Sequence, residues 1–263
     1  MNLGLKGKVA LVAAASRGLG RAVAQELATE GANLVICARD GQVLDETAAA
    51  IRARSGVEVL AMPTDVSQPA QIDKLVAEGL ERFGRIDVLV TNAGGPPSGQ
   101  FEALTPEMWD TAHRLTLMSS VNLVRAVLPG MKERRWGRII NVTSISVKQP
   151  VDALMLSNSI RAAVTGFART LATEVAPFGI TVNNALPGFT RTERVEKLAE
   201  ASAARGGPSA DVIRKGWEAA IPMGRIAEAE EFAALVVFLA SERASYITAQ
   251  SVAVDGGWIK SLL

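Results

Sequence analysis

A turn near the N-terminus contains the first residues whose types and spacing could do chemistry. An apolar run, Val9 to Ala13, precedes the turn, and apolar residues at helical spacing follow it. Between them lie Ser16, Arg17, Gly18, Leu19 and Gly20. The start of a helix leaves backbone N–H groups without partners and carries the positive end of the helix dipole, and glycines let a phosphate approach the backbone. The turn therefore predicts a nucleotide phosphate site, the alternative being a strand-to-helix connection without a ligand.

A second group of polar residues lies in the middle of the chain. Ser144 follows an apolar run that predicts a strand, and Ser157 and Arg161 are four residues apart in a segment with helical periodicity. Residues at that spacing lie on one face of a helix. Hydroxyl groups beside a guanidinium can hydrogen-bond and polarise a substrate oxygen, whereas the guanidinium stays charged and cannot pass a proton on. These three residues are candidates for catalysis.

Apolar strands and helices alternate along the chain and position these groups. After the first strand and helix, the patterns predict strands over residues 32–38, 57–62, 87–90, 139–142, 180–185 and 251–254. They predict helices over residues 42–54, 70–83, 105–131, 154–175 and 228–240. This alternation predicts an α/β fold, a Rossmann-type doubly wound parallel sheet flanked by helices on both faces, with ligands at the carboxyl ends of the strands. No linker interrupts it, so residues 1–263 are predicted to form a single dinucleotide-binding domain.

Composition excludes several other classes of protein. The 263 residues carry a net charge of +1, which argues against a general nucleic-acid surface. One histidine, His113, and one cysteine, Cys37, cannot build a zinc site of the usual type, so no metal is expected. No apolar run reaches the roughly 18 residues that span a bilayer, and the N-terminus lacks signal-peptide features. We therefore expect no membrane partner and a cytoplasmic location.

The end of the second predicted strand indicates which dinucleotide binds. This position usually faces the adenosine ribose, where an acidic residue accepts bonds from the 2′-hydroxyl and an arginine suits a 2′-phosphate. Ala38 leaves the acidic place empty and Arg39 follows it, with Arg17 in the glycine turn. The pattern favours NADP over NAD, although Arg39 as a solvated loop charge is the alternative.

Residues 193–220 differ in composition from the rest of the chain. The stretch from Ala199 to Ala210 is small, polar and glycine-rich, and it has little to bury. We predict a mobile substrate lid over about residues 189–220, the alternative being a plain surface insertion.

Several segments, in their order along the chain, carry a resemblance to a known family. They are AAASRGLG at Ala13, DV at Asp65, NAG at Asn92, IINVTS at Ile139, TVNNALPG at Thr181, IPMGR at Ile221 and VDGG at Val254. The sequence resembles the short-chain dehydrogenase/reductase family, and within it the 3-oxoacyl-acyl-carrier-protein reductase-like branch. The resemblance covers essentially the whole chain.

The resemblance implies a dinucleotide held by matching residues. Those of the turn, Ser16, Arg17, Gly18, Leu19 and Gly20, would hold the pyrophosphate and ribose. Asp65 and Val66 would flank the adenine; Asn92, Ala93 and Gly94 would lie along the ribose; Pro187, Gly188, Thr190 and Thr192 would approach the nicotinamide. One departure is Ala14, which replaces the first glycine of the family's turn.

The catalytic positions depart further from the family. The family uses an asparagine, a serine, a tyrosine and a lysine, and the flanking segments align these with Thr116, Ser144, Ser157 and Arg161. Only Ser144 matches. A serine hydroxyl is far less acidic than a phenol, so Ser157 would hydrogen-bond a carbonyl yet protonate an alkoxide poorly. Arg161 could still bond a ribose or polarise an oxygen.

Three hypotheses follow from these departures. The preferred one is an NADP(H)-dependent oxidoreductase acting on a carbonyl or alcohol, with a rebuilt site in which water or His113 supplies the proton. The second is a catalytically inactive nucleotide-binding regulator or scaffold subunit. The third is an enzyme of another class that uses the same pocket. The resemblance also implies a homotetramer, assembled through the two long helices and the C-terminal segment.

Overall fold

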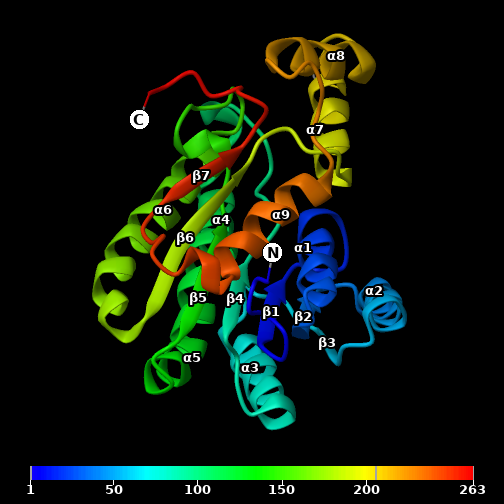
Figure 1. The fold of residues 1–263 in the computed structure, drawn as a ribbon. Coiled ribbons are helices and arrows are strands. Elements are labelled where there is room, and N and C mark those ends of the chain that lie inside the picture. The colour runs from blue at the N-terminus through cyan, green and yellow to red at the C-terminus, as the bar shows by residue number, and fades with distance from the viewer. Residues whose placement is uncertain (1, 205, 263) are drawn as a thin grey trace.

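Seven parallel strands form one sheet in the computed structural model, which describes residues 2–204 and 206–262 (Figure 1). In space the strands follow the order β3-β2-β1-β4-β5-β6-β7. Their bounds are β1 Val9–Ala13, β2 Asn33–Ala38, β3 Val59–Pro63, β4 Val88–Thr91, β5 Gly137–Val142, β6 Ile180–Pro187 and β7 Ser251–Val254. The order reverses between β1 and β4, which is where a doubly wound sheet opens a crevice for a ligand. The predicted fold class is confirmed.

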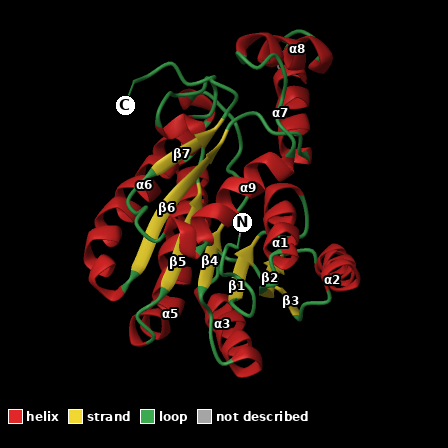
Figure 2. Ribbon diagram, viewed as in Figure 1, coloured by secondary structure: helices red, strands yellow, loops and turns green. Residues whose placement is uncertain are grey.

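Helices pack on both faces of the sheet (Figure 2). They are α1 Gly18–Thr29, α2 Gly41–Ser55, α3 Pro69–Phe83, α4 Pro106–Ala112, α5 Ser119–Glu133, α6 Met155–Val175, α7 Glu193–Ala204, α8 Ala210–Ala220 and α9 Ala229–Ala240. Alternate side chains of β1 enter two cores. Ala10 and Val12 pack with α1, α2 and α9, whereas Val9 and Leu11 pack with α3, α5 and α6. Burial on both faces explains why this strand is apolar at every position.

The predicted helix over residues 105–131 has an interruption that the sequence pattern does not reveal. Its start is as predicted, because the Thr105 side chain accepts a hydrogen bond from the backbone of Met108 and Pro106 occupies the first turn. From His113 to Met118, however, the chain forms a π-helical segment before α5 resumes the α-helical path. A π segment inside a helix widens one turn, and such segments are frequent at functional sites. Thr116 lies within it.

The segment predicted as a lid contains more helix than its composition indicates. Residues 193–204 and 210–220 form the helices α7 and α8, which pack against each other above the carboxyl ends of the strands (Figure 1). Trp217 of α8 stacks on Phe189 with ring centroids 4.7 Å apart. Trp258, near the end of the chain, meets Phe189 edge to face at 6.0 Å. Aromatic contacts therefore fasten α8 to the segment that follows β6.

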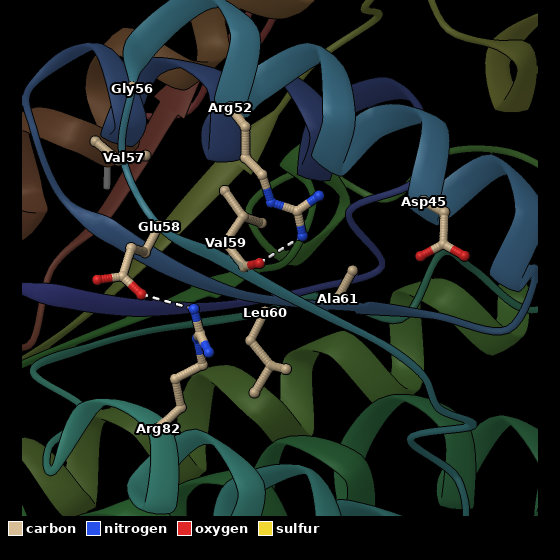
Figure 3. Close-up of a pocket in the computed structure, with 9 residues that line it drawn as sticks. All are labelled: Asp45, Arg52, Gly56, Val57, Glu58, Val59, Leu60, Ala61 and Arg82. Carbon is tan, nitrogen blue, oxygen red and sulfur yellow. Dashed lines mark hydrogen bonds and ion pairs between the residues drawn. The ribbon is translucent and has the colours of Figure 1, made fainter.

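The edge strand β3 is covered by charged side chains (Figure 3). Arg52 of α2 donates a hydrogen bond to the Val59 carbonyl at 2.6 Å. Arg82 of α3 pairs with Glu58 at 2.8 Å. Charged groups over an edge strand oppose pairing with a second chain. Arg52 and Arg82 line a hollow beside β3, and each already has a partner within the chain.

Within the described residues, no helix is long and apolar enough to cross a membrane. The same part of the chain contains no group of three or more metal-binding side chains of the His, Cys, Asp and Glu types.

Candidate functional site

A cleft of about 840 Å³ lies at the carboxyl ends of the strands. Its walls come from the turns that follow β1 to β6, from Leu115 of the π segment and from the helices α6 and α7. The turns meet here because parallel strands all end at the same edge of the sheet. Most candidate residues named from the sequence line this cleft.

The glycine turn forms one wall. Gly18 has a φ of +53° and begins α1, and no side chain caps the N-terminus of that helix. Its first turn also carries no acidic residue, so the exposed N–H groups are suited to an anion. Ala14 has a φ of 52°, a backbone conformation that favours glycine. The turn therefore keeps a helix N-terminus suited to an anion despite the methyl group of Ala14.

Gly20 has a packing role in the structure. It does not line the cleft, and a Cβ at this position would lie 2.2 Å from the Ala14 carbonyl oxygen. The absence of a side chain lets α1 pack closely against the end of β1. Gly20 therefore contributes to the glycine turn through packing and does not contact the cleft.

Two arginines lie at the adenosine end of the cleft expected from the sequence. Arg39 is exposed and lines the wall. Arg17 forms ion pairs with Asp40 at 3.4 Å and with Glu193 of α7 at 3.1 Å. Asp40 also caps α2 by accepting a hydrogen bond from Val43. Arg17 and Arg39 place positive charge at this end of the cleft, and Arg17 is linked to α7.

The segment after β6 forms the opposite wall. Gly188 packs against the end of β7, where a Cβ would lie 2.7 Å from the Asp255 Cα. The Thr192 hydroxyl donates to the Thr190 carbonyl at 3.2 Å, and its side chain lies against Gly18. The two walls therefore meet at Thr192, above the glycine turn.

Ser157 and Arg161 lie together in the cleft wall, as their spacing predicts. The Arg161 Nε donates to the Ser157 Oγ at 3.2 Å. The Arg161 Nη1 donates to the carbonyls of Val142 at 2.8 Å and Thr143 at 2.7 Å, and its Nη2 donates to the Gly94 carbonyl. Arg161 is buried, and none of these partners is an acid. A guanidinium held by carbonyl groups keeps its positive charge without neutralisation.

Burial, together with the smaller effect of the nearby positive charge of Arg194, lowers the pKa of Arg161 to about 10. Both causes oppose the charged form of the guanidinium. The Arg161 side chain nevertheless stays cationic at neutral pH and can stabilise negative charge that develops on a neighbouring oxygen.

Ser144 lines the cleft at the end of β5, and its Oγ accepts a hydrogen bond from the backbone of Ser146 at 3.1 Å. The Ser157 hydroxyl likewise accepts from Arg161. Each hydroxyl oxygen therefore receives one bond from the protein and keeps its own proton to donate. Both hydroxyl groups line the cleft and can donate hydrogen bonds to a molecule bound there.

Besides Gly20, the sequence candidates Thr116 and His113 lie outside the cleft wall, and so does Tyr246. Thr116 is buried, and its hydroxyl has no hydrogen-bond partner among the described residues. His113 is exposed on the π segment, so the structure does not bring it to the serines as a proton donor. Tyr246, the one tyrosine in the sequence, is fully exposed and also lies elsewhere.

The cleft brings the remaining candidates together. They are Ala14, Ser16, Arg17, Gly18, Leu19, Arg39, Asp65, Val66, Asn92, Ala93, Gly94, Ser144, Ser157, Arg161, Pro187, Gly188, Thr190 and Thr192. Sequence reasoning did not single out Phe189 and Arg194, which also line it. Their one signal is position, because both lie within or beside the segment expected to approach the nicotinamide.

The fold and the cleft define a dinucleotide-binding α/β protein with two hydroxyl groups and a buried cation beside the cofactor site. Residues 13–259 match the family model described as enoyl-(acyl carrier protein) reductase. The chain belongs to this family, that of the short-chain dehydrogenases/reductases, and the predicted family is confirmed.

Individual relatives cover nearly the whole chain. The 3-oxoacyl-[acyl-carrier-protein] reductase FabG of Escherichia coli is 35% identical over 256 residues, which cover 97% of this chain and 98% of the relative. L-Sorbose reductase from Gluconobacter frateurii, solved with NADPH and L-sorbose, is 37% identical with a TM-score of 0.94 and full coverage of both chains. Actinorhodin polyketide ketoreductase, solved with NADPH, is 34% identical with a TM-score of 0.93 and coverage of 97% and 98%.

Proposed function

We propose that this protein is an NADP(H)-dependent oxidoreductase that transfers a hydride between the cofactor and a carbonyl or alcohol substrate. The observation that carries the proposal is the contact between Ser157 and Arg161 in the wall of the cofactor cleft. Reductases similar to this chain have been solved with NADPH, which supports both the activity and the cofactor. NADP is favoured over NAD because Arg17 and Arg39 lie where a 2′-phosphate is expected.

The chain's residues fit such a cofactor. The N-terminus of α1 presents uncapped N–H groups to the cleft, and Gly18 keeps the cradle open to a pyrophosphate. The nicotinamide end would be held by Pro187, Gly188, Thr190 and Thr192, with Asn92 and Gly94 along the ribose. When bound, the reduced cofactor supplies the hydride that adds to the carbonyl carbon.

Ser144 and Ser157 would orient the substrate in place of the usual tyrosine. Their hydroxyl groups donate hydrogen bonds to the carbonyl oxygen, and Arg161 stabilises the negative charge that grows on this oxygen as the hydride adds. Water then supplies the proton that completes the alcohol, because no tyrosine or histidine of the described chain lines the cleft. Thr116 shapes the π segment behind the site.

The helices α7 and α8 would act as the substrate lid over about residues 189–220. Support comes from the position of α7, since Glu193, Arg194 and Leu198 line the same cleft as the serines. Closure of such a lid would exclude bulk water during hydride transfer and leave only bound water to supply the proton.

Assembly as a homotetramer and location in the cytoplasm stay predictions. The large apolar side chains of Phe101, Met108 and Met155 are 68%, 37% and 38% exposed on or beside α4 and α6, which supports packing of these helices against a second copy.

Oxidation of NADPH with a panel of ketones and aldehydes tests the activity. We expect turnover by the wild-type protein and a loss of about 100-fold in kcat/KM for Ser157→Ala, because one donor to the developing oxyanion is removed. Ser159→Ala is the matched control, since Ser159 is exposed on the same helix, and it should leave kcat/KM unchanged.

The same panel separates the oxidoreductase from the nucleotide-binding regulator. Tight binding of NADPH without oxidation by any carbonyl compound would contradict the proposal and favour the regulator, a role consistent with a cleft that has no tyrosine among its described lining residues. Equal kcat/KM values for the wild type and Ser157→Ala would remove Ser157 from the mechanism.

A further inference from the structure

Arg194 is a cation in the cleft without an acidic partner. Its Nη2 donates to the Pro96 carbonyl at 2.6 Å, and the guanidinium lies over Gly95, where a Cβ would be 3.0 Å from the same nitrogen. No carboxylate of the described residues forms a hydrogen bond or an ion pair with it. Arg194 is exposed to solvent where it lines the cleft, and partial burial of its guanidinium lowers its pKa.

The acidic residues nearest along the chain already have cationic partners. Glu193 pairs with Arg17 at 3.1 Å and with Lys197 at 2.5 Å. Glu196 pairs with Arg214 at 2.5 Å. Arg194, in the first turn of α7, therefore has no ion pair with either of these acids.

A second uncompensated cation lies close by. Arg161 donates to the Gly94 carbonyl and Arg194 donates to the Pro96 carbonyl, so one loop holds both guanidinium groups. The charge of Arg194 lowers the pKa of Arg161, so the two groups repel each other. A bound anion would relieve this repulsion, and a guanidinium binds carboxylate or phosphate oxygens with two parallel hydrogen bonds.

The surroundings of Arg194 indicate the rest of the ligand. Arg194 and Phe189 line the same cleft as Ser144 and Ser157, and Phe189 is backed by the rings of Trp217 and Trp258. The cleft therefore combines a positive charge, an aromatic surface and two hydroxyl donors.

We propose that Arg194 binds the anionic group of an oxo-acid substrate and selects such substrates over neutral ketones. This inference rests on the proposed oxidoreductase function, since it assigns the carbonyl of the same molecule to Ser144 and Ser157. The free Nη1 and remaining Nη2 hydrogens of Arg194 bind the carboxylate while its bond to Pro96 fixes the orientation of the guanidinium.

The test compares oxo acids with their methyl esters, which keep the carbonyl and remove the charge. The probes are pyruvate, acetoacetate and levulinate and the methyl ester of each, titrated by calorimetry into the protein saturated with NADP⁺. We expect at least one acid to bind about 10- to 100-fold more tightly than its ester, as expected for a charge-assisted hydrogen-bonded pair. Arg194→Gln should abolish this preference.

Lys197→Gln is the control, because Lys197 also lines the cleft but is already paired with Glu193. It should keep the preference for the acid. Equal binding of every acid and its ester, or an equal loss in both variants, would overturn the inference.

A loss of NADPH affinity in Arg194→Gln that matches the loss for the acid would also overturn it, since Arg194 would then serve a cofactor phosphate. These titrations measure binding without turnover. Failure of the oxidoreductase proposal, seen as an absence of NADPH oxidation, is therefore distinguishable from failure of the anion site.

Discussion

Arg161 is a buried cation whose partners are all neutral. Its guanidinium joins the end of β5, the loop after β4 and Ser157 of its own helix. A lysine at this position has three donors around one nitrogen, whereas the guanidinium directs five donors in a fixed plane. The departure from the family's lysine therefore changes how the cleft wall is held together as well as its chemistry.

Replacing Arg161 by lysine should destabilise the fold. The single ammonium group cannot reach Ser157 and the carbonyls of Val142 and Gly94 together, so buried acceptors lose their partners. We expect Arg161→Lys to lower the free energy of unfolding by about 2 to 3 kcal/mol. Urea denaturation followed by circular dichroism measures the change.

Arg169→Lys provides the comparison on the same helix. Arg169 is exposed and makes one hydrogen bond to the Ala249 carbonyl, so its replacement should change the free energy of unfolding by less than about 0.5 kcal/mol. An Arg161→Lys protein as stable as the wild type would show that the carbonyl contacts of Arg161 contribute little to the fold.

An ion pair between Arg17 and Glu193 connects two elements, the glycine turn and α7. Arg17 would have to contact a 2′-phosphate while Glu193 holds its guanidinium and adds negative charge beside the same anion. Glu193→Gln removes that charge, so it should strengthen NADPH binding by about 2- to 5-fold, in the range of an exposed ion pair. Fluorescence titration with NADPH at fixed salt measures the dissociation constant.

Glu200→Gln removes an acid from the exposed face of α7 outside the cleft and should leave NADPH affinity unchanged. NADH lacks the 2′-phosphate, so its affinity should rise less than that of NADPH in Glu193→Gln. A weaker affinity for NADPH in Glu193→Gln would mean that the link to Arg17 holds the cofactor site in its binding shape.

The sequence predicts some of these elements better than others. The strands follow from apolar runs such as Val9 to Ala13, because burial on both faces of the sheet leaves a signal at every residue. The π segment at Thr116 leaves no such signal, since one widened turn barely changes the spacing of apolar residues. The helix α8 was predicted only as part of a lid, because its contact through Trp217 depends on a distant partner, Phe189.

Some residues of the candidate site can likewise be predicted from the sequence, whereas others are revealed only by the fold. Turn residues such as Gly18 can be placed from local sequence because the strand, turn and helix are consecutive. The packing role of Gly20 requires knowing how close α1 lies to Ala14. Arg194 has the sequence appearance of an ordinary surface charge, and only the fold reveals that the neighbouring acids pair with Arg17, Lys197 and other cations.

The buried thiol of Cys37 makes the stability of the whole protein depend on pH. It lies fully buried in β2 between β1 and β3, and burial raises the pKa of its thiol from 9.0 to about 12. At pH values between these two pKa values, the thiol is ionised in the unfolded chain and protonated in the folded chain. The folded state then binds more protons, so the free energy of unfolding falls as the pH rises above 9.

Cys37→Ala should remove this contribution to the pH dependence. The difference in free energy of unfolding between wild type and variant should shift by about 1.4 kcal/mol per pH unit above the thiol's ordinary pKa, to the disadvantage of the wild type. Urea titrations at pH 7, 8, 9, 10 and 10.5 measure both proteins, and the subtraction cancels lysine and tyrosine titration. Below that pKa the two curves should run parallel, offset by a constant amount for the lost side-chain contacts. Parallel curves over the whole range would contradict the prediction, because they would require the Cys37 thiol to ionise equally in the folded and unfolded chains.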